Sequence, residues 1–250
     1  MKIRDYILNL RSVRLWNDFI FYFIIFIILM SIILFVGIIV LVVSVVFLDR
    51  YFARRRRDAL NAVAESLQFS FSTEAPDFLV ESLRPLHLFS RGRKRKVMNV
   101  LSGKRNDVDV KVMDYRFTTG SGKNRKRHSQ TLVLFESENL QFPTFFIRPE
   151  NLFHKIGSAV IGYQDIDFES HPAFSKRYLL RGPDEEAIRN CFSNEFLSSF
   201  ERLKGMCMEC DGNRIVYYRH GRRLPPKQLL SFLDEAIEAL ELLGNISLRA

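Results

Sequence analysis

One apolar segment restricts the fold of this chain more than any other feature of its sequence. From Phe19 to Leu48 the chain runs for 30 residues without a charged side chain. A bilayer has a hydrocarbon core of roughly 30 Å, which about 20 helical residues cross, and the apolar region of a cleaved signal peptide has only about 7 to 15 residues. We therefore expect one transmembrane helix over residues 19–48. A re-entrant loop that bends near Ser31 or Gly37 is the alternative.

Basic residues on both sides of this segment predict its orientation. Four of them lie in a basic amphipathic N-terminal segment, residues 1–18, and five arginines lie in a basic juxtamembrane linker, residues 49–57. Clustered positive charge favours the cytoplasmic side of a membrane. We therefore expect residues 58–250, a soluble domain, to be cytoplasmic. The opposite orientation would follow if the N-terminal segment lay on the cytoplasmic leaflet as an amphipathic helix.

The net charge of +9 comes from the part of the chain that follows the apolar segment. Residues 50–130 carry 19 basic and 8 acidic side chains, whereas residues 131–250 carry 14 basic and 17 acidic ones. Because each Lys or Arg gains about 1 kcal/mol near an anionic leaflet, we predict lipid or anion binding by three basic clusters. Their members are Arg54, Arg55, Arg56, Arg57, Arg93, Lys94, Arg95, Lys96, Lys123, Arg125, Lys126 and Arg127.

Two alternatives to lipid binding stay open for these basic residues. They could form a surface that is only solvated, or that only sets the membrane topology. They could also bind nucleic acid, but the sequence has neither an RNA-binding aromatic motif nor a helix-turn-helix pattern. We therefore expect membrane lipid, of the anionic kind, as the partner and disfavour nucleic acid.

Alternating polar and apolar residues predict antiparallel strands in the soluble domain. The clearest case is residues 107–117, where Val108, Val110 and Val112 would share one face. Helices are expected from Asp184 to Leu203 and after the two prolines at 225–226. We predict an α+β domain with two long helices in its C-terminal half. Its other strands should cover residues 97–101, 131–135, 144–148, 176–181, 206–210 and 214–219, and a helical turn should cover residues 149–156.

The sharpest chemical pattern in the sequence is a run of ionisable residues at every second position. Asp165, Asp167, Glu169 and His171 would project from one face of a strand, because side chains alternate across a strand. Three carboxylates and an imidazole could hold a divalent cation or act as general acid and base. The same pattern is also typical of a half-exposed strand with a solvated polar face.

Two other motifs fall short of a functional signature. Gly122-Lys123 resembles the end of a phosphate-binding loop, but Phe117 stands where the first glycine should be and Asn124 replaces the Ser or Thr. A lone C-x-x-C, Cys207 and Cys210, supplies only two of the four ligands that zinc usually has, and the others would have to come from Cys191, His220 or a distant His. No nucleophile signature is present either, so we predict neither a catalytic residue nor a cofactor.

Two segments of the chain look familiar: Val100-Leu101-Ser102-Gly103 running into Val108 to Tyr115, and Phe174-Ser175-Lys176-Arg177-Tyr178-Leu179-Leu180-Arg181-Gly182. They resemble a group of uncharacterised bacterial proteins in which N-terminal membrane spans precede an α+β domain. The resemblance covers residues 58–243 and implies a bacterial inner membrane, but it carries no activity. We expect a membrane-anchored, non-catalytic interaction module that rests on anionic lipid and contacts another membrane-associated protein. A membrane-tethered metal-dependent enzyme or metal-binding module that uses residues 165–171 is the alternative.

Overall fold

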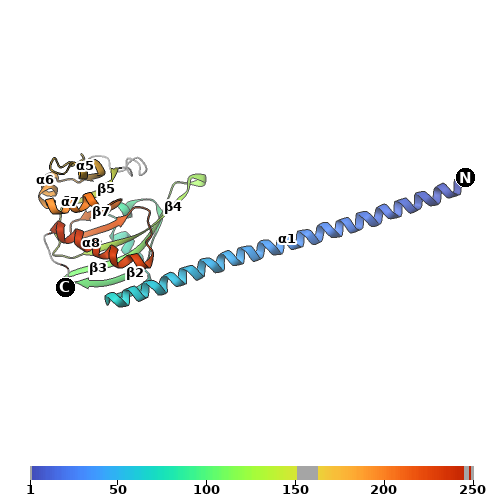
Figure 1. Ribbon diagram of the computed structural model, residues 1–250, viewed down its shortest axis with the longest axis horizontal. Helices are drawn as coiled ribbons and strands as arrows, with labels where there is room; N and C mark the ends of the chain where they lie inside the picture. The colour runs from blue at the N-terminus through green and yellow to red at the C-terminus, as the bar shows by residue number, and fades with distance from the viewer. Residues whose placement is uncertain (1, 151–162, 245–247, 249–250) are drawn as a thin grey trace. The chain divides into compact units, whose positions relative to one another are not determined.

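The computed structural model describes residues 2–150, 163–244 and 248. The chain divides into two compact units, Met1–Arg55 and Arg56–Ala250. The helical turn expected over residues 149–156 lies mostly outside the described residues. Helix α1, Lys2–Leu67, forms the first unit and contributes its last turns to the second (Figure 1).

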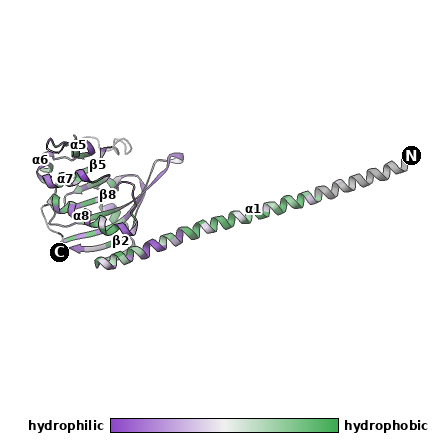
Figure 2. Cartoon of the chain, in the orientation of Figure 1, coloured by the Kyte–Doolittle hydropathy of each residue, from purple (hydrophilic) through white to green (hydrophobic). Residues whose placement is uncertain are grey.

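The apolar part of α1 has the length and composition of a membrane span. Figure 2 shows it as a continuous hydrophobic stretch of the helix. The large apolar side chains from Phe21 to Leu48 are each at least 39 % exposed, so they have no protein core of their own. Such a helix is suited to hydrocarbon, because its backbone groups are paired within the segment and its side chains are apolar.

The second unit is built on one eight-stranded sheet in which all the neighbouring strands are antiparallel, as the sequence predicted. The strand order is β1-β2-β3-β4-β8-β7-β5-β6. At its centre β4 pairs with β8, with Leu132 opposite Tyr218, which joins an N-terminal meander to a C-terminal group of strands. The strands are β1 Ser70–Glu74, β2 Arg93–Arg105, β3 Val108–Thr119, β4 Lys126–Glu136, β5 Phe145–Pro149, β6 Tyr178–Arg181, β7 Met206–Asp211 and β8 Arg214–Arg219.

Helices pack on both faces of this sheet, which confirms the α+β class. Side chains of α1, α7 and α8 cover what we call the first face, and those around α2 and α3 cover part of the second face. Along β3, Val110 and Val112 point to the first face and Tyr115 and Phe117 to the second. The helices after α1 are α2 Asp77–Ser82, α3 His87–Ser90, α5 Pro172–Arg177, α6 Glu185–Cys191, α7 Asn194–Arg202 and α8 Leu229–Gly244.

The helix expected from Asp184 to Leu203 is divided into α6 and α7. Phe192 has φ −95° and ψ 96°, which ends α6. Ser193 then accepts a hydrogen bond from the backbone N–H of Phe196 at 3.1 Å and so caps a new helix. The segment expected to form one helix therefore forms two short helices, α6 and α7.

The strand expected over residues 165–171 is absent: residues 163–168 are irregular and a turn follows. Pro172 has no backbone N–H to give to a sheet and stands in the first turn of α5. As a result, β6 begins at Tyr178 rather than at Lys176 as expected. The side chains of Asp165, Asp167, Glu169 and His171 thus do not line one strand face.

Candidate functional site

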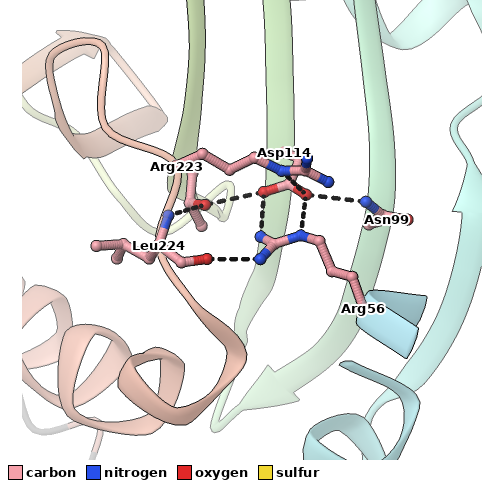
Figure 3. Close-up of polar contacts among 6 residues, drawn as sticks. Arg56, Asn99, Asp114, Arg223 and Leu224 are labelled. Carbon is pink, nitrogen blue, oxygen red and sulfur yellow. Dashed lines mark hydrogen bonds and ion pairs between the residues drawn. The ribbon is translucent and has the colours of Figure 1, made fainter. Parts of the chain in front are cut away.

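Asp114 of β3 is a buried carboxylate on the first face of the sheet, at the position where the valine pattern of this strand would place an apolar residue. Its oxygens accept five hydrogen bonds. Arg56 donates a hydrogen bond to each carboxylate oxygen, from Nε to Oδ2 at 3.0 Å and from Nη2 to Oδ1 at 2.9 Å (Figure 3). The other donors are Arg223 Nε at 3.0 Å, Asn99 Nδ2 at 2.8 Å and Thr131 Oγ1 at 2.8 Å.

The surrounding backbone completes this network. Arg56 also donates from Nη1 to the carbonyl of Leu224 at 2.7 Å, and the N–H of Leu224 donates to Thr131 Oγ1 at 3.0 Å. Asn99 lies in a bulge of β2 with φ 52°, a left-handed conformation that asparagine tolerates better than most residues. The network therefore ties the end of α1 to β2, β3, β4 and the segment before α8.

The balance of forces on Asp114 favours its ionised form. Burial acts to raise the pKa of this carboxyl, but the hydrogen bond and positive charge of Arg56, together with the charge of Arg223, hold the pKa below its ordinary value. The arrangement is a structural ion-pair centre and offers no open ligand position. Sequence reasoning missed this centre because it grouped Arg56 with the neighbouring arginines. The available signal was that Asp114 continues the every-second-residue spacing of Val108, Val110 and Val112, and so falls on the buried face of the strand.

The basic residues predicted to bind lipid lie in different settings. Arg54, Arg55 and Arg57 are exposed, whereas Arg56 is held by Asp114, with 14 % of its side chain exposed. The guanidinium of Arg55 lies 5.3 Å from the ring centre of Tyr51. Three of the four arginines, Arg54, Arg55 and Arg57, are thus at the surface, and Arg56 belongs to the folded core.

The second cluster, Arg93 to Lys96, lines a pocket of about 470 Å³ between α2 and β2. Ion pairs within the domain hold Lys96 to Glu74 at 2.7 Å and Arg95 to Glu81 at 3.5 Å. Arg93 donates to the carbonyl of Gly120 at 2.8 Å, which links this cluster to the loop between β3 and β4. Lys94 is exposed, with φ 53°, at an irregularity of β2.

The third cluster occupies the tip of the β3–β4 hairpin. Gly122–Asn124 form a single turn of 3₁₀ helix there, in the loop that joins β3 to β4. Lys123, Arg125, Lys126 and Arg127 are all exposed. Figure 1 shows this hairpin projecting beyond the rest of the sheet, so its four cations are open to a large anionic surface.

The acidic residues predicted as a metal site have separate roles. Asp165 accepts a hydrogen bond from the N–H of Leu180 at 3.2 Å, and the carbonyl of Asp167 accepts one from Arg189 at 2.7 Å. The ring of His171 contacts the hydroxyls of Ser170 and Ser198 at 3.1 and 3.2 Å. Glu169 is exposed. Across residues 2–150, 163–244 and 248, no group of three or more His, Cys, Asp and Glu side chains is arranged to hold a metal ion.

The two cysteines of the C-x-x-C pair point to opposite faces of β7. Cys207 packs into the core of the second face and Cys210 into that of the first. Burial raises the pKa of Cys207 to about 12 and that of Cys191 to about 11. Thiols held protonated in this way are poor nucleophiles and poor metal ligands.

Comparison with known proteins informs the fold. No protein-family model matches this chain, and no curated protein matches it. A similar fold is found in the crystal structure of the mycobacterial trehalose monomycolate transport factor A, TtfA, with a TM-score of 0.54 and 12 % sequence identity. The match covers 78 % of this chain and 98 % of that chain. At this level of identity the likeness is one of architecture alone.

Proposed function

We propose that this chain is a membrane-anchored, non-catalytic interaction module of the bacterial inner membrane. In this proposal the apolar part of α1 is a single span, and the folded unit is cytoplasmic and binds anionic lipid. The observation that carries the proposal is the hairpin tip, where four of five consecutive residues from Lys123 to Arg127 are exposed cations. We propose membrane-associated proteins as its further class of partner. The transport factor TtfA, which has a similar fold, is compatible with this proposal.

The charge arrangement supports lipid as the first partner. Cations within a Debye length of an anionic leaflet each gain about 1 kcal/mol, and salt screens this attraction. Four such residues at one tip can therefore hold a tethered domain on the surface without a shaped pocket. Arg93 and Lys94 add charge close to the loop of the same hairpin, because Arg93 donates a hydrogen bond to the carbonyl of Gly120 in that loop.

A fluorophore at the hairpin tip tests this proposal directly. The exposed Ser121 is replaced, Ser121→Cys, and labelled, and the full chain is reconstituted in vesicles that carry nitroxide-labelled lipid. We expect strong quenching with phosphatidylglycerol, weak quenching with phosphatidylcholine alone, and loss of the difference at high salt. Equal quenching in both lipids would show that the cations are only solvated.

A charge-matched pair of variants separates the hairpin from net charge. One variant carries Gln at Lys123, Arg125, Lys126 and Arg127. The control carries Gln at four other exposed basic residues, Lys176, Arg202, Lys204 and Lys227. Only the first should lose lipid-dependent quenching. Protease protection in sealed right-side-out vesicles tests orientation separately: digestion of the folded unit from outside would overturn the cytoplasmic assignment.

A further inference from the structure

Among the described residues of the second unit, Phe78 of α2 is the most exposed large apolar side chain, at 71 %. Other apolar residues of this short helix are covered: Leu79 and Val80 pack against the core of the second face, and Leu83, directly after the helix, is 1 % exposed. These contacts fix the orientation of α2. Its packing therefore holds the ring of Phe78 away from the core.

The register of the sheet places α2 at the same end as the tip of the β3–β4 hairpin. β1 ends at Glu74, which pairs with Met98 of β2, and α2 begins three residues later. β2 begins at Arg93, which pairs with Thr118 near the end of β3. Arg93 also donates to the carbonyl of Gly120 in the hairpin loop. Phe78 and the four cations of the tip thus belong to one end of the sheet.

The segment that contains α2 and the start of β2 carries an excess of positive charge. Residues 74–96 include six Arg or Lys and three Asp or Glu, a net charge of +3. Ion pairs already hold two of the carboxylates, Glu74 with Lys96 at 2.7 Å and Glu81 with Arg95 at 3.5 Å. The surface around the exposed ring therefore attracts anions.

The pocket of about 470 Å³ lies beside α2. Pro76 and Val80 line it from the helix, and Arg93 and Lys94 line it from β2. Lys94 is exposed, and within residues 2–150, 163–244 and 248 its ammonium has no hydrogen-bond or ion-pair partner. Pockets for small ligands have volumes of about 300 to 1,000 Å³. The space is large enough for one anionic lipid headgroup, with Lys94 as its free cation.

The proposed membrane anchor keeps this surface close to a bilayer. Arg56, the first residue of the second unit, follows Leu48 by eight residues of α1, which is about 12 Å of helix. A short tether raises the effective concentration of one binding surface at the other. Aromatic side chains accompanied by Lys and Arg are typical of segments that bind at the boundary between headgroups and acyl chains.

We propose that Phe78 is an aromatic membrane anchor, whose ring enters the boundary between headgroups and acyl chains of an anionic leaflet while Arg93 and Lys94 bind a lipid phosphate in the adjoining pocket. This inference rests on the proposed function, because it needs the folded unit to lie on the leaflet that the hairpin tip binds. It adds a hydrophobic contact to an electrostatic one. The two contacts differ in depth, since the charged tip stays among the headgroups.

A single tryptophan at position 78 measures the depth of this contact. Trp16→Phe removes the one tryptophan of the chain, and Phe78→Trp keeps an aromatic ring at the exposed site. The full chain is reconstituted in phosphatidylglycerol vesicles whose acyl chains carry bromine, a short-range quencher of tryptophan fluorescence. We expect quenching of about twofold or more and a blue-shifted emission, and much less of both in brominated phosphatidylcholine. Quenching that is equal in the two lipids, or absent from both, overturns the proposal.

Tyr163→Trp, in the same Trp16→Phe background, is the matched control. Tyr163 is an aromatic residue with 45 % exposure, and it lines a cavity with Phe146 of β5 and Arg181 of β6, near the opposite edge of the sheet from β1. It should show no lipid-dependent quenching, and equal quenching at both positions overturns the assignment to α2.

The label on Ser121→Cys keeps the failure of this inference distinct from the failure of the proposed function. Lipid-dependent quenching of that label without quenching of a tryptophan at position 78 overturns the aromatic anchor alone. Absence of lipid-dependent quenching at both sites overturns the anchor and the lipid-binding hairpin together.

Removing the ring measures its contribution to attachment. Phe78→Asn changes an exposed side chain and so leaves the core in place. With the label at position 121 as readout, we expect the salt concentration that halves the lipid-dependent quenching to fall about twofold or more, because screened charge then acts without a hydrophobic contact. Tyr163→Asn should leave that concentration unchanged. If Phe78→Asn leaves it unchanged as well, the ring is no anchor.

Lys94→Asn tests the cation of the pocket. Asparagine tolerates the left-handed backbone of this position, where φ is 53°. We expect about twofold weaker quenching of the tryptophan at position 78 in phosphatidylglycerol, because one phosphate contact is lost. Lys204→Asn removes an exposed cation elsewhere and should have no effect. Quenching that Lys94→Asn leaves unchanged removes the pocket from the site.

Discussion

Arg56 and Asp114 lie 58 residues apart and share two hydrogen bonds in a side-on, two-oxygen arrangement. Arg55, the preceding residue, is exposed and contacts only the ring of Tyr51 among the interactions described for it. One residue of a four-arginine run is therefore part of the folded core of the second unit. Because of this ion pair, the last turns of α1 are part of the folded domain and not a linker that leads to it.

Removing the carboxylate of Asp114 should destabilise the domain strongly. Asp114→Asn leaves the guanidinium of Arg56 buried without its counter-charge, and loss of one partner of a buried pair costs about 3 to 5 kcal/mol. Arg56→Gln should cost less, about 1.5 to 3 kcal/mol, because Arg223, Asn99 and Thr131 still satisfy Asp114. Amide hydrogen exchange of β3 and β4 measures both losses.

The matched control for this pair is Arg55→Gln, which removes an exposed arginine next in sequence. Its effect should stay within about 0.5 kcal/mol. The double variant Arg56→Gln with Asp114→Asn should be more stable than the sum of the single changes predicts, because both charges are gone. Strict additivity in that cycle would mean that the two side chains do not interact in solution.

Acid should destabilise this domain in two steps that begin at different pH values. The pKa values of His87 and His220 in the folded state, about 3 and about 4, lie below the unfolded value of 6.5. The unfolded chain therefore binds more protons as the pH falls from about 6.5, and stability declines down to about pH 4 through His220 and down to about pH 3 through His87. The contribution of Asp114, whose pKa is also lowered, is present above 3.8 and is lost only as the pH falls through its folded value.

Urea midpoints from tyrosine fluorescence between pH 4 and pH 8 measure the first of these steps. His220→Gln removes one of the two groups and should flatten the slope between pH 6.5 and pH 4. His171→Gln is the control, since this ring contacts two serine hydroxyls near the surface. A slope that His220→Gln leaves unchanged would contradict the assignment.

Ser193→Ala tests the division between α6 and α7. The serine hydroxyl accepts from the N–H of Phe196, and loss of a cap costs about 1 kcal/mol. Ser231→Ala, at an exposed serine whose hydroxyl donates to Gln228, should change stability by less than about 0.5 kcal/mol. If α6 and α7 were one helix in solution, the first substitution would be neutral or stabilising, because alanine is a strong helix former.

Gly103→Ala tests the packing of β2 against the start of β1. A Cβ at this position would lie 2.1 Å from Cδ1 of Phe69, whose ring is 6 % exposed. Overpacking of a core typically costs about 1 to 3 kcal/mol, and we expect a loss of that size in urea unfolding. Phe69→Leu should remove most of the additional cost, and a double variant no better than Gly103→Ala alone would disprove the clash.

Local patterns in the sequence predicted local structure well. The valines of residues 108–112 identified β3, and the strands expected over residues 206–210 and 214–219 are β7 and β8, which form a hairpin in which Gly212 has φ 66°. These predictions depend only on residues that are close together in the sequence. The prediction of one helix from Asp184 was wrong at Ser193. Apolar residues recur at every fourth position on both sides of this serine, but the serine caps a new helix.

The candidate sites could not be predicted from the same kind of signal. The partners of Asp114 come from residues 56, 99, 131 and 223, which lie far apart in the sequence. Only the sheet order brings them together. The acidic run at 165–171 was misassigned because its spacing fits a strand, whereas Pro172 and the turn before it prevent one from forming.

The pairing of β4 with β8 has a consequence for how the protein is made. Glu136 pairs with Arg214, so the centre of the sheet cannot close until nearly all of the chain has left the ribosome. Pairings between distant segments form late in folding, and chains emerge at about 5 to 20 residues per second. The hydrophobic N-terminus is therefore exposed long before the sheet exists. In the proposed function, targeting to the bilayer would therefore precede completion of the domain. The edge of β4 stays unpaired, and open to chaperones or wrong partners, for several seconds.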